Sequence, residues 1–134
     1  MDILKYFKDV NAQKQINKLV RKYKDKKIVI YGAGEYFKIL NENFNIQDLN
    51  IIAIADKKFE ASKETNTTKY IPLAPEELKT YDYDVIMVAL YDDANLIDFL
   101  EYNLLIDTKN EDKEVISIIE PTIWYLIKLF ILEK

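Results

Sequence analysis

Short, continuously apolar segments recur along this chain, and they limit the possible folds more than any other feature of the sequence. Four of them are rich in apolar and β-branched residues: Ile28–Tyr31, Asn50–Ala55, Asp84–Leu90 and Glu114–Ile119. Unbroken runs of this length are typical of strands that are buried on both faces of a sheet. A short extended piece, Tyr70–Leu73, adds a fifth strand.

Helical patterns lie between and around these strands. The expected helical segments are residues 1–27, residues 35–45, one turn from Pro75, a segment capped by Asp92 or Asp93, and a last segment opened by Pro121. Residues 57–69 are polar without an apolar period and predict a loop. Strands that alternate with helices predict an α/β fold: a doubly wound parallel sheet of about five strands, Rossmann-like, in the order 3-2-1-4-5.

The chain has 134 residues, which suits one domain with a substantial core. No internal repeat or linker divides it. We therefore expect a single Rossmann-like nucleotide-binding domain over residues 1–134. Its parts are an N-terminal helical extension (1–27), the core (28–120) and a C-terminal helix (121–134).

Two glycines follow the first apolar run directly, in the stretch Gly32-Ala33-Gly34. Gly32 permits a tight turn from strand to helix, and Gly34 lacks the Cβ that would keep a pyrophosphate away from backbone N–H groups. The next helix presents N–H donors and the positive end of its dipole at the same place. Asp56 ends the second strand about 20 residues further on, where an acid accepts a hydrogen bond from a ribose hydroxyl. The ordered set predicts a nucleotide site.

The predicted ligand is NAD or a nucleotide-sugar. Lys57 and Lys58 follow Asp56 and could meet a 2′-phosphate, but the charge of Asp56 would repel that group, so a non-phosphorylated ribose is favoured. The candidate binding residues are Gly32, Ala33, Gly34, Glu35, Tyr36, Asp56, Lys57, Ala89 and Leu90. A simpler alternative is that the glycines only form a turn and that Asp56 caps a loop. Phe37 stands where a third glycine is usual, and its bulk favours this alternative.

The composition excludes several kinds of chemistry. The chain has no cysteine and no histidine, which excludes disulfides, thiolate metal sites and an imidazole general base. The closely spaced acids Asp82, Asp84, Asp92 and Asp93 are interpreted as turn and capping residues. We therefore predict no catalytic residue and no metal site. A net charge of −4 without a long basic run argues against nucleic acid, and the missing cysteines are compatible with a cytoplasmic location.

The segments "KIVIYGAGE", "IADKKFE" and "IPLAPEELKTYDYDVIMVAL" resemble a family of small Rossmann-like domains in bacterial surface-polysaccharide biosynthesis. Such domains stand at the front of nucleotide-sugar 4,6-dehydratases and of sugar acetyltransferases, and some are attached to glycosyltransferases. The resemblance covers Lys27 to Pro121. It implies nucleotide or nucleotide-sugar contacts at Gly32, Ala33, Gly34, Glu35 and Asp56, while Phe37 departs from the small residue usual there. The catalytic Tyr/Lys domain of the dehydratases and the hexapeptide-repeat domain of the acetyltransferases have no counterpart in the sequence.

We expect a nucleotide-binding module without a complete active site, associated with surface-polysaccharide or nucleotide-sugar metabolism. Two alternatives remain open: an NAD-dependent sugar-nucleotide dehydratase or oxidoreductase completed by another domain or subunit, and a ligand-free interaction or scaffold domain. Apolar residues cover more than one face of the last helix, so we expect a homo-oligomer or a contact with another domain through the terminal helices. The stretch between Pro121 and Glu133 is shorter than a membrane helix, so no membrane span is predicted.

Overall fold

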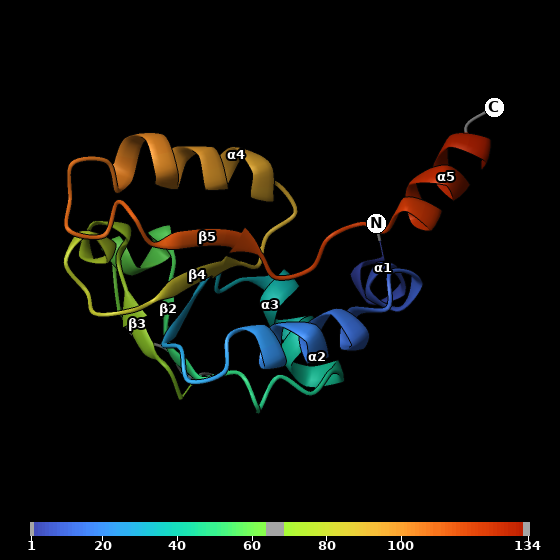
Figure 1. Cartoon of the computed structure of the whole chain (residues 1–134), viewed down its shortest axis with the longest axis horizontal. Helices are drawn as coiled ribbons and strands as arrows, with labels where there is room; N and C mark the ends of the chain where they lie inside the picture. The colour runs from blue at the N-terminus through green and yellow to red at the C-terminus, as the bar shows by residue number, and fades with distance from the viewer. Residues whose placement is uncertain (1, 64–68, 133–134) are drawn as a thin grey trace.

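The computed structural model describes residues 2–63 and 69–132 and contains one parallel sheet (Figure 1). Its strands are β1 (Ile28–Tyr31), β2 (Ile51–Ala55), β3 (Ile71–Leu73), β4 (Val85–Val88) and β5 (Glu114–Ser117). All neighbours in the sheet pair in parallel, in the order β3-β2-β1-β4-β5. The predicted Rossmann-like fold class and strand order are confirmed.

Helices cover both faces of this sheet (Figure 1). They are α1 (Ile3–Asp9), α2 (Ala12–Lys22), α3 (Glu35–Asn43), α4 (Asp93–Phe99) and α5 (Ile123–Leu132), with short 3₁₀ turns η1 (Lys57–Glu60) and η2 (Pro75–Lys79) and a π-helical turn η3 (Leu100–Leu104). One buried cluster lies between the sheet and α1, α2 and α3, and a second lies between the sheet and α4, η2 and η3. Ile28, Val29 and Ile30 are fully buried because β1 is the central strand.

The register aligns the carboxyl ends of the three strands that matter for a ligand. Tyr31, the last residue of β1, pairs with Ala55 of β2 and with Val88 of β4. The connections that follow these strands therefore meet at one edge of the sheet, and the strand order reverses there between β1 and β4.

Several local expectations are wrong, each for a physical reason. Residues 1–27 do not form continuous helix, because Asn11 adopts a left-handed conformation (φ 55°) between α1 and α2. The expected loop at 57–69 begins with η1, which buries Phe59, whereas residues 64–68 lie outside the described residues. Asp92 does stand at the N-cap of α4, as expected, but its side chain makes no capping hydrogen bond and instead accepts one from Asn95 Nδ2 at 2.8 Å.

The last helix also begins later than expected. Pro121 precedes α5, which begins at Ile123, and Thr122 Oγ1 accepts a hydrogen bond from Tyr125 N at 3.1 Å. The hydroxyl thus satisfies one of the donors that a helix leaves open at its first turn. None of the helices in the described part of the chain has the length and apolar character that a membrane crossing requires.

Candidate functional site

The turn after β1 requires glycine at its first position. Gly32 has a φ of 125°, and a Cβ built on it would lie 2.5 Å from Ala89 O, closer than real side chains approach. Its N–H donates to Ala55 O at 2.9 Å, so the turn is also tied to β2. Gly32 is therefore explained by the fold itself, with no need for a ligand.

Gly34 differs from Gly32 in its backbone conformation and in the space around it. Its backbone is extended (φ −101°), and a Cβ built on it would meet nothing within 4 Å. It is exposed and forms the N-cap of α3, with no side chain to cap the helix. The first N–H groups of a helix have no partner within it, so backbone donors stand beside an open surface here.

Asp56 ties the glycine turn to the end of β2. One carboxylate oxygen accepts a hydrogen bond from Ala33 N at 2.7 Å, and the other accepts from Lys58 N at 3.0 Å. Lys58 Nζ completes the link by donating to Ala33 O at 2.7 Å. A carboxylate has about four lone-pair sites, so Asp56 keeps capacity for a ligand hydroxyl while it holds the turn.

The cation beside the turn is Lys58, the second of the two lysines considered above for a 2′-phosphate, although only Lys57 was among the candidate binding residues. Lys57, the residue predicted for this role, is exposed in η1, and Lys58 is the one that reaches the glycine turn. The side chains after Asp56 do not point to opposite faces in turn, as they would in a strand, because η1 begins directly after this residue. Below the turn, burial and then the negative charges of Asp56 and Glu60 raise the pKa of Tyr31 to about 12.

The other predicted residues lie on both sides of the turn. Ala89 and Leu90 approach Gly32 rather than Gly34, since the nearest atoms to the Cβ built on Gly32 are those of Ala89 and Leu90. Glu35 is exposed in the first turn of α3, directly after Gly34. The structure thus brings the glycine turn, Glu35 and Asp56 to one place and sets Ala89 and Leu90 behind Gly32.

Phe37, at the position of the usual third glycine, is accommodated by the core. Its side chain is buried, and its ring packs edge-on against Tyr70, with 6.4 Å between the ring centroids. The ring is therefore part of the buried cluster between the sheet and α1, α2 and α3. This arrangement lets a large residue stand in the first turns of α3 without filling the space at Gly34.

Tyr36 belongs to an aromatic cluster that local sequence patterns did not reveal. We define this cluster as Tyr6, Phe7, Tyr36 and Tyr91. The Tyr36 ring lies 4.9 Å from the Phe7 ring and 5.4 Å from the Tyr91 ring, in both cases edge-on, and Tyr6 lies 6.3 Å from Tyr91. Burial, followed by the neighbouring Tyr6 and Asp93, raises the pKa of Tyr36. The cluster joins α1, α3 and the segment after β4.

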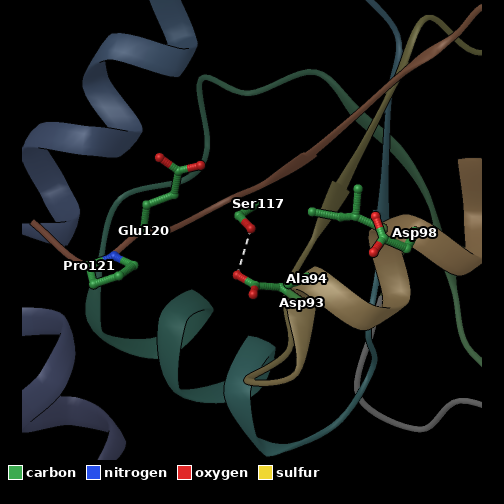
Figure 2. Close-up of a pocket in the computed structure, with 7 residues that line it drawn as sticks. Asp93, Ala94, Asp98, Ser117, Glu120 and Pro121 are labelled. Atoms are coloured by element: carbon green, nitrogen blue, oxygen red, sulfur yellow. Dashed lines mark hydrogen bonds between the residues drawn. The ribbon is translucent and has the colours of Figure 1, made fainter.

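A second feature at this edge is an acidic pocket of about 490 Å³, shown in Figure 2. It is lined by Asp93, Ala94, Ile97, Asp98, Ser117, Glu120 and Pro121. Ser117 Oγ at the end of β5 donates to Asp93 Oδ2 at 2.5 Å, which links β5 to the start of α4. Within residues 2–63 and 69–132, no group of three or more His, Cys, Asp or Glu side chains could hold a metal ion.

The chain can be compared with protein families, with curated proteins and with solved structures. The family model described as C2185-like, N-terminal, matches residues 24–101, more than half of the chain. None of the curated proteins matches the sequence significantly. Among solved structures, the chain is similar to a chorismate mutase/shikimate 5-dehydrogenase fusion protein from Clostridium acetobutylicum, at 14% identity and a TM-score of 0.42. The likeness covers 79% of this chain and 48% of that one, so this chain spans about half its length.

Proposed function

The chain belongs to the C2185-like, N-terminal family, whose matched segment contains the whole glycine turn and Asp56, and from this premise we propose that it is a nucleotide-binding module. The proposed ligand is NAD or a nucleoside-diphosphate sugar. The resemblance of the sequence to domains of surface-polysaccharide biosynthesis supports a role in nucleotide-sugar metabolism. The module contributes binding, and any reaction is completed elsewhere.

One observation carries this proposal: the contrast between the two glycines. The fold explains Gly32 by its positive φ and its close approach to Ala89. No contact with the described residues requires glycine at position 34, because a side chain there would have an ordinary backbone conformation and free space. A residue without a Cβ at the start of a helix is what a phosphate needs to reach the N–H groups.

Charge at the site supports the same ligand. Lys58 places an ammonium group at the glycine turn, and the dipole of α3 adds positive potential. Asp56 stands at the end of β2, where a carboxylate can accept from ribose hydroxyls. Glu35 adds a negative charge in the first turn of the same helix, so we expect modest, micromolar affinity rather than tight binding.

The test is a thermal-shift screen with NAD, NADP, UDP-sugars and coenzyme A at millimolar concentration. A ligand present at about 100 times its Kd stabilises the folded state by about 2.7 kcal/mol, which gives a measurable rise in Tm. We expect at least one of the non-2′-phosphorylated nucleotides to raise the Tm. Asp56→Asn should remove most of that rise.

The matched control is Asp48→Asn, an exposed aspartate before β2, at the opposite end of the sheet. This variant should keep the full ligand-induced rise. Because Asp56 also holds Ala33 and Lys58, the quantity to compare is the shift caused by ligand, not the Tm of the free variant. The proposal fails if no nucleotide at millimolar concentration shifts unfolding of the wild type.

We also propose that α5 pairs with a second copy of the chain. Figure 1 shows this helix extending away from the sheet, beside α1. Eight of its apolar side chains are exposed, to between 39% and 77%: Ile123, Trp124, Leu126, Ile127, Leu129, Phe130, Ile131 and Leu132. Side chains of this size carry on the order of 200 Å² each, so roughly 800 Å² is available per copy, the area that a specific interface buries on each partner.

Sedimentation velocity over a range of protein concentrations tests this pairing. We expect a dimer at micromolar concentration, and Trp124→Lys together with Ile131→Lys should make the protein a monomer. Both side chains are exposed in a single copy, at 77% and 65%, so the substitutions spare its core. Lys18→Glu on the exposed face of α2 serves as the control and should stay dimeric. A wild type that is monomeric throughout the range rules out the pairing.

A further inference from the structure

The aromatic cluster limits the size of ligand that the site can take. In a doubly wound sheet, a dinucleotide crosses the point where the strand order reverses, with one ribose at the acid after β2 and its second half beyond β4. On this chain the first half would lie at Gly34 and Asp56. The second half would have to pass the segment after β4, which carries Tyr91, to reach the acidic pocket beside β5.

Aromatic side chains of the protein itself lie in contact between the start of α3 and the segment after β4. Tyr91 lies three residues beyond the end of β4, and its ring is in direct contact with Tyr36 in the first turn of α3. The centroid of the Tyr6 ring, in α1, lies 6.3 Å from that of the Tyr91 ring. The centroid of the Phe7 ring lies 4.9 Å from that of the Tyr36 ring. Centroid separations of 4.5–7 Å are those of rings in contact, so no further ring fits between them.

The side of the turn toward β2 is different in character. Gly34 faces open space, and the lysines of η1 are exposed beside it. Asp56 has capacity for hydroxyl groups in addition to the two N–H groups that it already accepts. Among the described residues, this side offers free space at Gly34, positive charge and a ribose acceptor, the features that a single nucleotide uses.

We propose that the site recognises a nucleoside 5′-monophosphate or diphosphate on the half between β1 and β2, and that the aromatic cluster excludes the second half of a dinucleotide. The proposal rests on the proposed function and narrows its ligand class. A sugar attached to the terminal phosphate would point to solvent and add no affinity, whereas the second nucleoside of a dinucleotide would meet the aromatic cluster and weaken binding.

Isothermal titration calorimetry with two pairs of ligands tests this: ADP against NAD, and UDP against UDP-glucose. We expect the Kd of NAD to exceed that of ADP at least tenfold, and UDP-glucose to bind no more tightly than UDP. Tyr91→Ala should reduce the ratio of the Kd of NAD to the Kd of ADP to less than about threefold. ADP and NAD are compared in the wild type and in Tyr91→Ala alike. The different charges of the two ligands therefore do not affect the change in the ratio of their Kd values.

Tyr102→Ala is the matched control, since Tyr102 is 67% exposed on η3 and lies outside the cluster. It should preserve the tenfold preference. If NAD binds the wild type as tightly as ADP, or if Tyr91→Ala leaves the preference unchanged, the exclusion is wrong while the proposed function stands. If no nucleotide binds, the proposed function fails and the inference falls with it.

Discussion

Gly32→Ala is expected to lower the free energy of unfolding by about 3 kcal/mol or more. A non-glycine residue in a disfavoured backbone conformation costs about 1–3 kcal/mol, and forcing extra atoms into a packed site costs about 1–3 kcal/mol. Both costs apply, because φ is 125° and the new Cβ would lie 2.5 Å from Ala89 O. The neighbouring atom is backbone in the residue directly after β4, and Ala89 N donates to Tyr31 O of β1 at 2.8 Å, so this backbone cannot move aside cheaply.

Gly34→Ala is the matched control two residues away. Its extended conformation suits alanine, and no atom lies within 4 Å of the new methyl group, so we expect a change within about 1 kcal/mol. Urea denaturation followed by circular dichroism measures both variants. Equal losses of stability in the two variants would contradict the assignment of Gly32 to the fold and of Gly34 to the ligand.

Phe7→Ala is the second substitution with a large expected effect, a loss of about 3–5 kcal/mol. Phe7 is fully buried, and its ring contacts the rings of Tyr36 at 4.9 Å and Phe44 at 5.8 Å, so its removal leaves a cavity between α1 and α3. For a domain of this size, the Tm should fall by roughly 10 °C or more. Differential scanning calorimetry provides the measurement.

Phe99→Ala provides the comparison for Phe7, because the Phe99 side chain on α4 is 45% exposed. We expect it to change stability by less than about 1.5 kcal/mol. The pair also tests the predicted division of the chain at residue 27. A large loss for Phe7→Ala would make α1 part of the cooperative unit, and a loss below about 1 kcal/mol would make it an appended extension.

The strands and their order could be predicted from the sequence because their signals are local and continuous. Ile28–Tyr31 is apolar at every position and ends at glycine, so both its burial and its end are visible in the sequence. The same reasoning placed Asp56 directly after β2, where the structure has it. Right-handed crossovers then left few arrangements of the strands.

The features that were missed depend on contacts between distant segments or on single residues. Asn11 breaks the N-terminal helix through a left-handed conformation that its type tolerates but does not require. Phe59 is one apolar residue in a polar stretch, and only the tertiary structure shows that it is buried. The aromatic cluster takes its rings from α1, α3 and the segment after β4, so no periodicity in any one segment reveals it.

The most direct test of a nucleotide site at Gly34 is a titration of the ¹⁵N-labelled protein with ADP and with UDP, followed by amide NMR spectra. Binding at this site predicts chemical-shift changes concentrated at residues 33–36 and at Asp56 to Lys58. It also predicts that Gly34→Ala raises the Kd at least tenfold, a loss of about 1.4 kcal/mol, while the unfolding curve stays the same. Shift changes located elsewhere, or equal affinity of the wild type and Gly34→Ala, would contradict it.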